Sequence, residues 1–377
     1  MSLIKKIILL FVCIWSNWAF GHEVSLREKI GQMLIFGFQG KNVTEDSDIT
    51  RSIFMYNLGG VILFDYDYQS KLYDRNIESP EQVQLLNTSL QTFTKKANKK
   101  YKRPNLPLFI SVDYEGGLVT RLSEQYGFPA TFSAKQLGQM SISDAKLQAE
   151  SMADTLKTAG FNLDFAPDAD LDVNPETSFI SKKERSFSAD PDMVSQYGKT
   201  FSQAFQEKKI ECAYKHFPGH GSAAGDTHLG FVDVTDTWSK EELIPFVQQI
   251  NEPNHCHFLM TAHVVNRQIE PSGVPATLSY KILTSLVREQ YNFDGIIISD
   301  DMQMKAIAAN YGLEEALTMA INAGVDMLIF GNQVAEVPQN PKEIIDIIEK
   351  QVKKGKIKKE RIESAYNQII KVKTRLL

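Results

Sequence analysis

Eight short apolar runs constrain the fold more than any other feature of this sequence. Each run is followed by a polar loop and then by a stretch with helical spacing. Runs such as "GGVILF" and "HFLMTAHVV" are almost continuously apolar, which is typical of strands buried on both faces of a parallel sheet. The sequence therefore predicts a parallel sheet covered by helices, with strands within residues 32–38, 59–64, 106–112, 161–167, 210–216, 257–265, 293–299 and 325–331.

The stretches between these runs predict helices, and no linker rich in proline, glycine or serine interrupts the series. Helical spacing is clearest in residues 81–98, 143–159, 190–208, 279–290 and 314–323. The alternation of eight strands with helices favours an α/β fold made of a single (β/α)8 TIM barrel. A doubly wound open sheet stays as the alternative, because periodicity does not reveal whether a sheet closes.

The first 21 residues have the composition of a secretory signal peptide. Lys5 and Lys6 precede the apolar run "IILLFVCIW", and the small residues of "AFG" stand before His22. A run of nine residues is too short to cross about 30 Å of hydrocarbon as a helix, so an uncleaved anchor is the less favoured alternative. We expect cleavage after residue 21, a mature domain of residues 22–377 without a stable membrane span, and a periplasmic or secreted location.

Charge and cysteine content exclude several classes of function. The formal net charge is −5, and it becomes −7 once the two lysines of the signal peptide are lost, which argues against a nucleic-acid partner. The mature part keeps Cys212 and Cys256, which are too few for a disulfide scaffold and lack the spacing of a zinc site. Two buried free thiols are the favoured interpretation, and a single disulfide in an exported protein is the less favoured one.

Polar residues gather where six of the eight predicted strands end. In a TIM barrel the carboxyl ends of the strands face the active site, so side chains at these positions meet at one mouth. Any one of them is equally well explained as a helix cap or a turn residue, but their concurrence predicts a site. The residues are Asp65, Asp113, Asp168, Lys215, His216, His263, Asp300 and Asp301.

The segment "GIIISDDM" (295–302) places Asp300 and Asp301 at the end of a buried strand. A carboxylate held rigidly there is suited to attack on the anomeric carbon of a sugar, because a nucleophile must lie in line with the departing oxygen. Paired acids also bind Mg²⁺ or Ca²⁺, but such a site needs more oxygen ligands than Asp326 can add. A carboxylate nucleophile is therefore the favoured interpretation.

The segment "DYEGGLVTRL" (113–122) places Asp113 at a strand end and Arg121 eight residues later. An aspartate accepts hydrogen bonds from sugar hydroxyls and an arginine donates them in a fork, so the pair is suited to hold a sugar. Taken alone, the same two residues are more often a structural ion pair.

The segment "KHFPGHGSAAGDTH" (215–228) is a glycine-rich loop with three histidines. The spacing of Asp226 and His228 lets the carboxylate orient the imidazole, which then acts as a general acid and base near neutral pH. A zinc site is the alternative, with His216, His220, Asp226 and His228 as ligands. We expect no metal, because Pro218 and Gly219 break the regular spacing of a helical zinc motif.

These three segments, together with "PATLSYKILTSLVREQYNFDGIIISDDMQM" (275–304), resemble the single-domain β-N-acetylglucosaminidase branch of glycoside hydrolase family 3. The resemblance runs from about Leu26 to the C-terminus. It implies that Asp300 is the nucleophile and that Asp226 and His228 are the acid/base dyad. It also implies sugar-binding roles for Asp113, Arg121, Lys215, His216 and, in "ERSFSADP", Arg185.

The resemblance implies a retaining, exo-acting enzyme that removes terminal β-linked GlcNAc from peptidoglycan fragments or related glycans through a covalent glycosyl-enzyme. It implies a carbohydrate substrate, no cofactor and a monomeric chain. Three alternatives stay open: a β-glycoside phosphorylase, a β-glucosidase on the same site, and a non-catalytic glycan-binding protein. The last is disfavoured because both Asp300 and His228 are present.

Two features depart from that branch. Residues 176–184, "ETSFISKKE", stand where the family has a shorter segment with Asn-Pro and Ile-Gly, so the loop before Arg185 is expected to have its own shape. The predicted signal peptide also differs, because well-known members recycle peptidoglycan fragments in the cytoplasm.

Overall fold

The structure is a computed structural model that describes residues 24–334 and 338–377. The predicted signal peptide, residues 1–21, lies outside the described residues. No helix of the described ranges combines the length and the apolar character needed to cross a bilayer.

Eight parallel strands close into a barrel, which confirms the predicted (β/α)8 fold and excludes the open sheet. Neighbouring strands pair in the order β1-β12-β11-β9-β7-β6-β3-β2, and β1 pairs with both β12 and β2. Each strand lies in one of the predicted apolar runs or extends it by one or two residues. The strands are β1 Leu34–Gly37, β2 Gly60–Ile62, β3 Phe109–Val112, β6 Leu163–Asp164, β7 Glu211–Phe217, β9 Phe258–Thr261, β11 Ile296–Asp301 and β12 Met327–Phe330.

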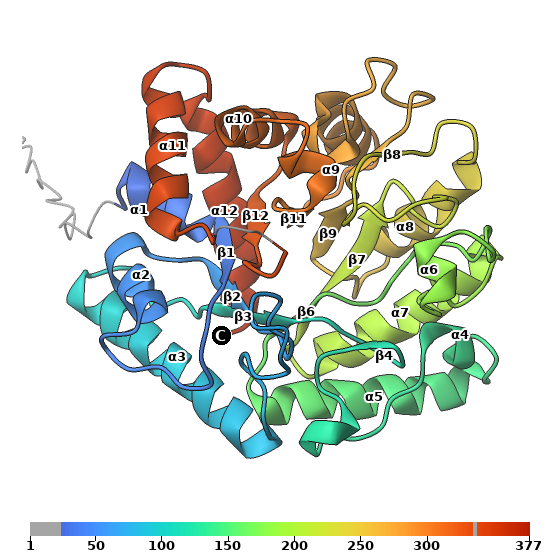
Figure 1. Cartoon of the computed structure of the whole chain (residues 1–377), viewed down its shortest axis with the longest axis horizontal. Helices are drawn as coiled ribbons and strands as arrows, with labels where there is room; N and C mark the ends of the chain where they lie inside the picture. Colours follow the sequence, from blue (N-terminus) through green and yellow to red (C-terminus); the bar gives the residue numbers. More distant parts are fainter. Residues whose placement is uncertain (1–23, 335–337) are drawn as a thin grey trace, which may run out of the picture.

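Helices surround the strands in a ring (Figure 1). Side chains cap several of their first turns, as Ser25, Ser79 and Ser141 do, because the first N–H groups of a helix have no partner within it. The helices are α1 Leu26–Gln32, α2 Asp48–Tyr56, α3 Pro80–Lys100, α4 Ala134–Leu137, α5 Ile142–Ala159, α6 Phe179–Lys182, α7 Pro191–Glu207, α8 Ile244–Ile250, α9 Lys305–Ala308, α10 Leu313–Ala323, α11 Pro341–Lys353 and α12 Lys359–Arg375.

The predicted helices at 81–98, 143–159, 190–208 and 314–323 are confirmed as α3, α5, α7 and α10. The stretch 279–290 forms a π-helix instead, η4 Lys281–Gln290. Three 3-10 turns complete the helical elements, η1 Glu124–Tyr126, η2 Lys240–Leu243 and η3 Ala276–Leu278.

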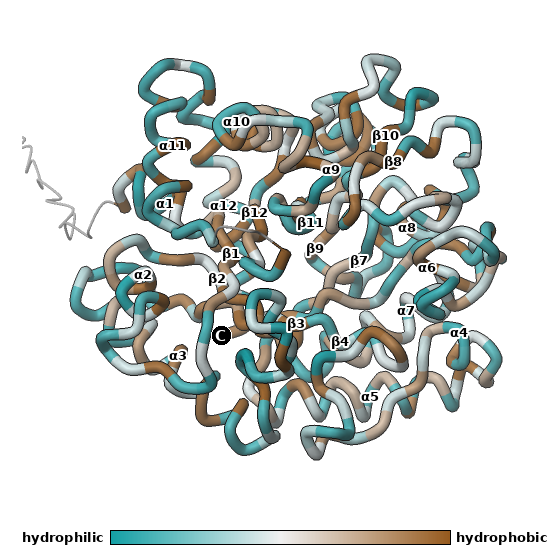
Figure 2. Tube along the Cα trace, in the orientation of Figure 1, coloured by the Kyte–Doolittle hydropathy of each residue, from teal (hydrophilic) through white to brown (hydrophobic). Residues whose placement is uncertain are grey.

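The core fills the barrel and the space between the barrel and its helices. Its strand residues are almost all inaccessible to solvent, and Phe36 stacks on Phe330 across β1 and β12 with ring centroids 5.2 Å apart. In Figure 2 the surrounding helices carry both brown and teal residues, as amphipathic helices do when one side packs on a sheet. The buried strands therefore form a fixed base for side chains at their ends.

Two short sheets lie outside the barrel, in the loops that follow its strands. β4 Tyr114–Gly116 and β5 Val119–Thr120 form an antiparallel pair directly after β3. β8 Val232–Asp233 pairs in parallel with β10 Val264–Val265, which follows β9. Both therefore belong to loops at the carboxyl ends of the strands, where a TIM barrel carries its active site.

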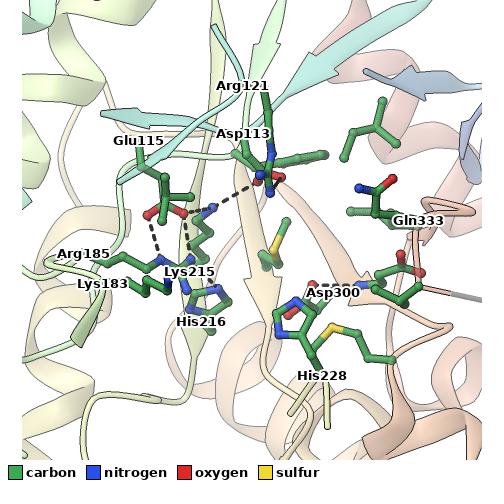
Figure 3. A pocket seen from close by; sticks show the side chains of 18 of the residues that line it. Asp113, Glu115, Arg121, Lys183, Arg185, Lys215, His216, His228, Asp300 and Gln333 are labelled. Atoms are coloured by element: carbon green, nitrogen blue, oxygen red, sulfur yellow. Dashed lines mark hydrogen bonds and ion pairs between the residues drawn. The ribbon is translucent and has the colours of Figure 1, made fainter. Parts of the chain in front are cut away.

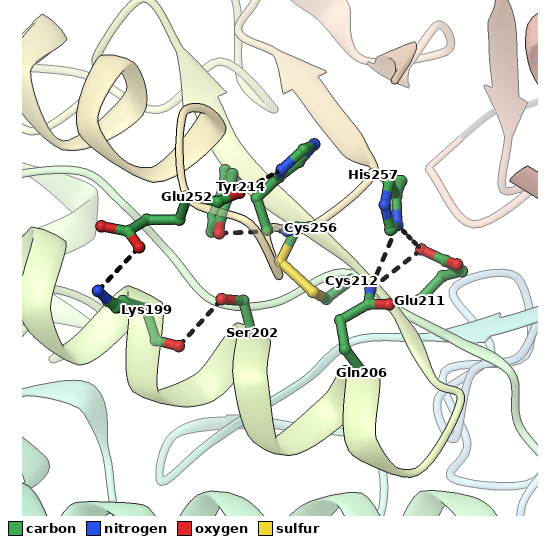
Figure 4. Close-up of a disulfide and its surroundings, with 10 residues drawn as sticks. Lys199, Ser202, Gln206, Glu211, Cys212, Tyr214, Glu252, Cys256 and His257 are labelled. Atoms are coloured by element: carbon green, nitrogen blue, oxygen red, sulfur yellow. Dashed lines mark hydrogen bonds and ion pairs between the residues drawn. A yellow bond between two sulfur atoms is a disulfide. The ribbon is translucent and has the colours of Figure 1, made fainter. Parts of the chain in front are cut away.

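The favoured interpretation of Cys212 and Cys256 as free thiols is wrong, because the two residues form a disulfide (Figure 4). Cys212 lies near the start of β7, and Cys256 lies two residues before the neighbouring strand β9. Parallel neighbours begin at the same end of the barrel, so the two residues meet with their Cα atoms 4.7 Å apart.

Candidate active site

A cavity of about 270 Å³ opens at the carboxyl ends of the strands. Of the eight residues to which the sequence assigns a catalytic or sugar-binding role, seven line it: Asp113, Arg121, Arg185, Lys215, His216, His228 and Asp300. Figure 3 shows them on three sides, with Arg185, Lys215 and His216 on one side, Asp300 and His228 on another, and Asp113 with Arg121 between them. The eighth, Asp226, does not line the cavity but contacts His228.

Asp300 and Asp301, adjacent at the end of β11, have different surroundings. The Asp301 carboxylate accepts hydrogen bonds from the backbone N–H of Gln303 at 3.0 Å and of Gly331 at 3.2 Å, so it holds the backbone of two loops. Burial raises the pKa of Asp301 to about 7. The Asp300 carboxylate accepts one hydrogen bond among the described residues, from the backbone N–H of Asp301 at 2.7 Å. Asp300 is therefore the acid whose oxygen is available to a ligand.

Three neighbouring histidines and a backbone N–H keep Asp300 ionised. Burial by itself raises the pKa of this carboxyl, but His263, His216, His228 and the N–H of Asp301 outweigh burial and bring the pKa below its usual value. His263, which does not line the cavity, is buried and donates a hydrogen bond from Nε2 to the backbone oxygen of Asp301 at 3.0 Å. An ionised carboxylate at this position has the charge that a nucleophile needs.

Asp226 and His228 form a dyad on the loop after β7. Nδ1 of His228 donates to Oδ1 of Asp226 at 2.7 Å, and the backbone N–H of His228 reaches the same oxygen at 2.9 Å. Burial lowers the pKa of His228, but the hydrogen bond to Asp226 and the charges of Asp300 and Asp226 raise it above its usual value. The His228 side chain is 45% exposed, so Nε2 can exchange protons with a ligand or with water.

Glu115, Arg185 and Lys215 form a buried ion cluster on the opposite side. Arg185 binds Glu115 in a fork, with Nε to Oε2 at 2.8 Å and Nη2 to Oε1 at 2.7 Å. Lys215, at the end of β7, also pairs with Oε1 of Glu115. Burial raises the pKa of Glu115, but the charges of Arg185 and Lys215 outweigh burial and lower it. The carboxylate thereby fixes two cations at the cavity wall.

His216 is held from behind by Asp170, beside which lies a second buried aspartate, Asp168. Its Nδ1 donates to Asp170 at 2.7 Å, so Nε2 is left to accept a hydrogen bond from Nη2 of Arg185 at 3.2 Å. Asp168 pairs with Nε of Arg185 at 3.3 Å. Burial and the neighbouring charge of Asp170 raise the pKa of Asp168 well above its usual value, whereas Asp170 stays ionised beside His216.

Asp113 and Arg121 lie between the buried cluster of Glu115, Arg185 and Lys215 and the mouth of the cavity. Nη2 of Arg121 lies 3.6 Å from Oδ2 of Asp113, and Nζ of Lys215 lies 3.4 Å from Oδ1. Their side chains are 20% and 32% exposed. They form an ion pair, as the alternative interpretation of this segment held, but one that faces the cavity and can bind a ligand.

Sequence reasoning did not assign a role to Glu115 or Asp170. Glu115 stands in the quoted segment "DYEGG", two residues after Asp113, and Asp170 stands two residues after the strand-end Asp168. The sequence signal that could have found them is this spacing. Side chains two residues apart in an extended segment point to the same side, so each of the two acids lies on the same side as the strand-end aspartate before it. Phe179 also lines the cavity from the segment that departs from the family pattern, with its ring centroid 5.9 Å from that of His228.

The zinc alternative does not match the observed arrangement. Within the described ranges, the only group of three acidic or histidine side chains whose ligand atoms converge within 4.8 Å is Asp168, Asp170 and His216. Arg185 already pairs with two of these three residues. Asp326 is paired with Arg361 at 2.6 Å and does not line the cavity, so it does not add a carboxylate to Asp300 and Asp301.

Comparisons with known proteins agree with this geometry. The model of the glycosyl hydrolase family 3 N terminal domain matches residues 25–372. Beta-hexosaminidase A of Pseudoalteromonas piscicida is 29% identical over 357 residues, which cover 87% of this chain and 55% of that protein. A beta-hexosaminidase of Shewanella frigidimarina is 35% identical over 287 residues, which cover 73% of this chain and 75% of that protein.

Among solved structures, a family 3 beta-N-acetylglucosaminidase from Paenibacillus sp. str. FPU-7 superposes with a TM-score of 0.82 at 29% identity. The match covers 94% of this chain and 63% of that one, so the chain spans little more than half of some of its longer relatives. The match of the family model over nearly the whole described chain and the shared barrel lead to one conclusion: this chain belongs to glycosyl hydrolase family 3, a family of glycoside hydrolases.

Proposed function

We propose that this chain is an exo-acting β-N-acetylglucosaminidase that works with retention of configuration. The observation that carries the proposal is the meeting, in one cavity, of an ionised carboxylate, Asp300, with a carboxylate-oriented imidazole, His228. The names of the beta-hexosaminidase relatives and of the Paenibacillus beta-N-acetylglucosaminidase support the choice of sugar.

In the first step the Asp300 carboxylate attacks the anomeric carbon and forms a C–O bond to it. The bond from that carbon to the leaving oxygen breaks, and the leaving oxygen takes the proton from Nε2 of His228. The raised pKa of His228 supports this role, because the imidazole must be protonated when the bond breaks. The product is a glycosyl-enzyme ester on Asp300 and a neutral imidazole on His228.

In the second step His228 acts as the base. Its neutral Nε2 takes a proton from water, the water oxygen attacks the anomeric carbon, and the ester bond to Asp300 breaks. Asp226 stabilises the charged imidazole before the first step and after the second, because its carboxylate accepts the hydrogen bond from Nδ1.

The remaining polar residues bind the sugar. Asp113 accepts hydrogen bonds from sugar hydroxyls, while Arg121, Arg185 and Lys215 donate hydrogen bonds, and His216 orients Arg185. Apolar side chains such as Phe165, Met260 and Ile329 line the floor. A cavity closed on one side by buried ion pairs supports removal of a terminal sugar over cleavage within a chain.

We further propose that the protein acts outside the inner membrane on GlcNAc-containing glycans such as peptidoglycan fragments. The disulfide between Cys212 and Cys256 supports an oxidising compartment, because disulfides are rare where glutathione and thioredoxin keep thiols reduced. The signal-like composition of residues 1–21 supports the same location. Cell fractionation with mass measurement of the purified chain tests this, since we expect a mature N-terminus at His22 in the periplasmic fraction.

The activity is tested with chromogenic β-GlcNAc and β-glucose substrates and the variants Asp300→Ala and Asp301→Asn, each with and without added phosphate. We expect hydrolysis of β-GlcNAc, loss of about 10⁴-fold or more in kcat for Asp300→Ala, and no dependence on phosphate. Phosphate-dependent release of a sugar phosphate would favour the phosphorylase alternative. Activity that survives Asp300→Ala would rule out Asp300 as the nucleophile.

A further inference from the structure

A narrow loop with three tyrosines, residues 65–75, follows β2 and is not used by the proposed chemistry. Its two arms run antiparallel: the N–H of Asp67 donates to the oxygen of Leu72 at 2.8 Å, and the N–H of Arg75 donates to that of Asp65 at 3.2 Å. We call residues 65–75 the tyrosine loop. In Figure 1 it is the blue segment between β2 and α3, close to the centre of the barrel.

The base of the tyrosine loop is fixed to the rim of the barrel. The buried side chain of Arg75 donates to the backbone oxygens of Gly331 at 2.7 Å and Phe38 at 3.1 Å, and it also contacts Gln333. Asn76 binds the backbone oxygens of Phe38 at 3.1 Å and Gly40 at 2.9 Å. Because its base is held by buried hydrogen bonds, the loop presents its side chains in a defined place.

The ring of Tyr66 contacts the rings of Tyr68 and Tyr73, and these two stay exposed. The ring of Tyr66 lies 4.9 Å from that of Tyr73 and 5.5 Å from that of Tyr68, measured between centroids. Tyr68 is 58% exposed and Tyr73 is 63% exposed. Exposed aromatic rings that are already ordered by mutual contact lose little conformational freedom when a ligand binds, so they are suited to contact a flat, partly apolar ligand.

Two residues outside the tyrosine loop connect it to the lining of the cavity. Phe64, directly before the loop, lines the cavity, and so does Gln333, whose Nε2 donates to the backbone oxygen of Tyr66 at 2.8 Å. Figure 3 shows Gln333 on the side of the cavity away from Arg185 and Lys215. With the hydroxyls of the terminal sugar on the buried cations, the leaving group on its anomeric carbon lies on the side of the cavity away from them, which is the side of Gln333.

We propose that Tyr68 and Tyr73 bind the sugar on the leaving-group side of the cleaved bond. The faces of a β-linked pyranose ring carry C–H groups, which pack on aromatic rings, while its equatorial hydroxyls stay in water. The preferred substrate is then a β-linked oligosaccharide of at least two sugars, not a monosaccharide carried on a small leaving group. This inference rests on the proposed function and names its substrate class.

The test compares two substrates on one set of variants. Methyl β-N-acetylglucosaminide has a leaving group too small to reach the tyrosine loop, whereas β-1,4-linked GlcNAc disaccharide and trisaccharide place a sugar on it. For the double variant Tyr68→Ala/Tyr73→Ala we expect kcat/KM to fall about tenfold on the oligosaccharides and to stay unchanged on the methyl glycoside. The variant Tyr68→Phe/Tyr73→Phe keeps the rings and should retain the activity of the wild type on both.

Tyr280→Ala is the matched control, because Tyr280 is 56% exposed and does not line the cavity. An equal kcat/KM of the double alanine variant and the wild type on the oligosaccharides would overturn the inference, as would an equal loss on the methyl glycoside. A wild-type protein without activity on any β-GlcNAc substrate would instead overturn the proposed function. In that case calorimetric titration of the Asp300→Ala variant with the trisaccharide still tests the tyrosine loop, since weaker binding is expected on removing its two exposed rings.

Discussion

The two sides of the cavity hold their polar groups in different ways. We call Glu115, Arg185, Lys215 and His216 the buried wall, because their side chains are no more than 9% exposed and pair with one another. The acid/base pair, Asp226 and His228, lies on a loop and is 22% and 45% exposed. Charges that must stay in place are paired inside the protein, and the group that must exchange protons with a leaving group and with water is left accessible.

This contrast predicts that substitutions of Asp226 and His228 on the loop change the catalytic rate alone. Substitutions in the buried wall should lower the free energy of unfolding as well. Among the substitutions that test this contrast, His228→Ala is expected to have the largest effect on rate. We expect kcat to fall about 10³-fold on substrates with a poor leaving group and much less on a dinitrophenyl glycoside, which departs without protonation. The free energy of unfolding should change by no more than about 0.5 kcal/mol, because the side chain is surface-exposed.

Glu115→Ala tests the other side. The substitution leaves the buried cations of Arg185 and Lys215 without their shared partner, so we expect a loss of about 3–5 kcal/mol in the free energy of unfolding, measured with denaturant. The control is Glu252→Ala, which removes a half-exposed ion pair with Lys199 and should cost less than about 1 kcal/mol. Equal stabilities of the two variants would refute the distinction between the buried wall and the surface.

The disulfide supports β7, the strand that carries Lys215 and His216 of the buried wall, since Cys212 stands three residues before Lys215. It closes a segment of 44 residues, so replacing both cysteines by alanine should lower the stability by about 2–4 kcal/mol. Thermal unfolding with and without reductant checks this. An unchanged melting temperature in the alanine variant would show that the disulfide does not contribute to the stability of the protein.

The smallest expected effect is a change in the pH profile on Asp226→Asn. The hydrogen bond and charge of Asp226 help to raise the pKa of His228. A general acid works only below its pKa, so wild-type kcat/KM should fall as the pH rises through a value above the usual pKa of His228. Without the carboxylate, this alkaline limb should move to lower pH. Asp233→Asn, away from the cavity, should leave the profile unchanged.

The acid limb of that profile reports Asp300. Because the pKa of Asp300 is lowered, its carboxylate stays ionised below the usual range of an aspartate. Activity should therefore persist into mildly acidic solution in the wild type and in Asp226→Asn alike. If the acid limb moved together with the alkaline limb in Asp226→Asn, the two limbs could not be assigned separately to Asp300 and His228.

The fold could be predicted from the sequence because buried parallel strands have almost continuously apolar sequences. In a closed barrel, the polar residues at the carboxyl ends of these strands then meet at one mouth. Seven predicted site residues accordingly meet in one cavity. Glu115 was not assigned because its role depends on which way a side chain points in the short sheet after β3. The disulfide was misjudged although Cys212 and Cys256 stand at the same end of neighbouring runs, a relation that becomes visible only once strand order is known.

The tyrosine loop shows a further limit of sequence reasoning. The segment "DYDYQSKLYD" looks like an ordinary polar loop, and only the buried contacts of Arg75 and the hydrogen bond from Gln333 to Tyr66 place this loop beside residues that line the cavity. Strand-end residues are placed by the barrel itself, whereas loop residues are placed by side-chain contacts that have no periodic signature in the sequence.

The most direct test of the central claim is to identify the residue that carries the sugar. The mature protein is incubated with a 5-fluoro-N-acetylglucosaminyl fluoride, which slows hydrolysis of a covalent adduct, and is then digested and analysed by tandem mass spectrometry. We predict one modified site, the carboxylate of Asp300, and no adduct in Asp300→Ala. An adduct on Asp113 or Asp301, or turnover with no covalent adduct and inversion at the anomeric carbon, would contradict the account.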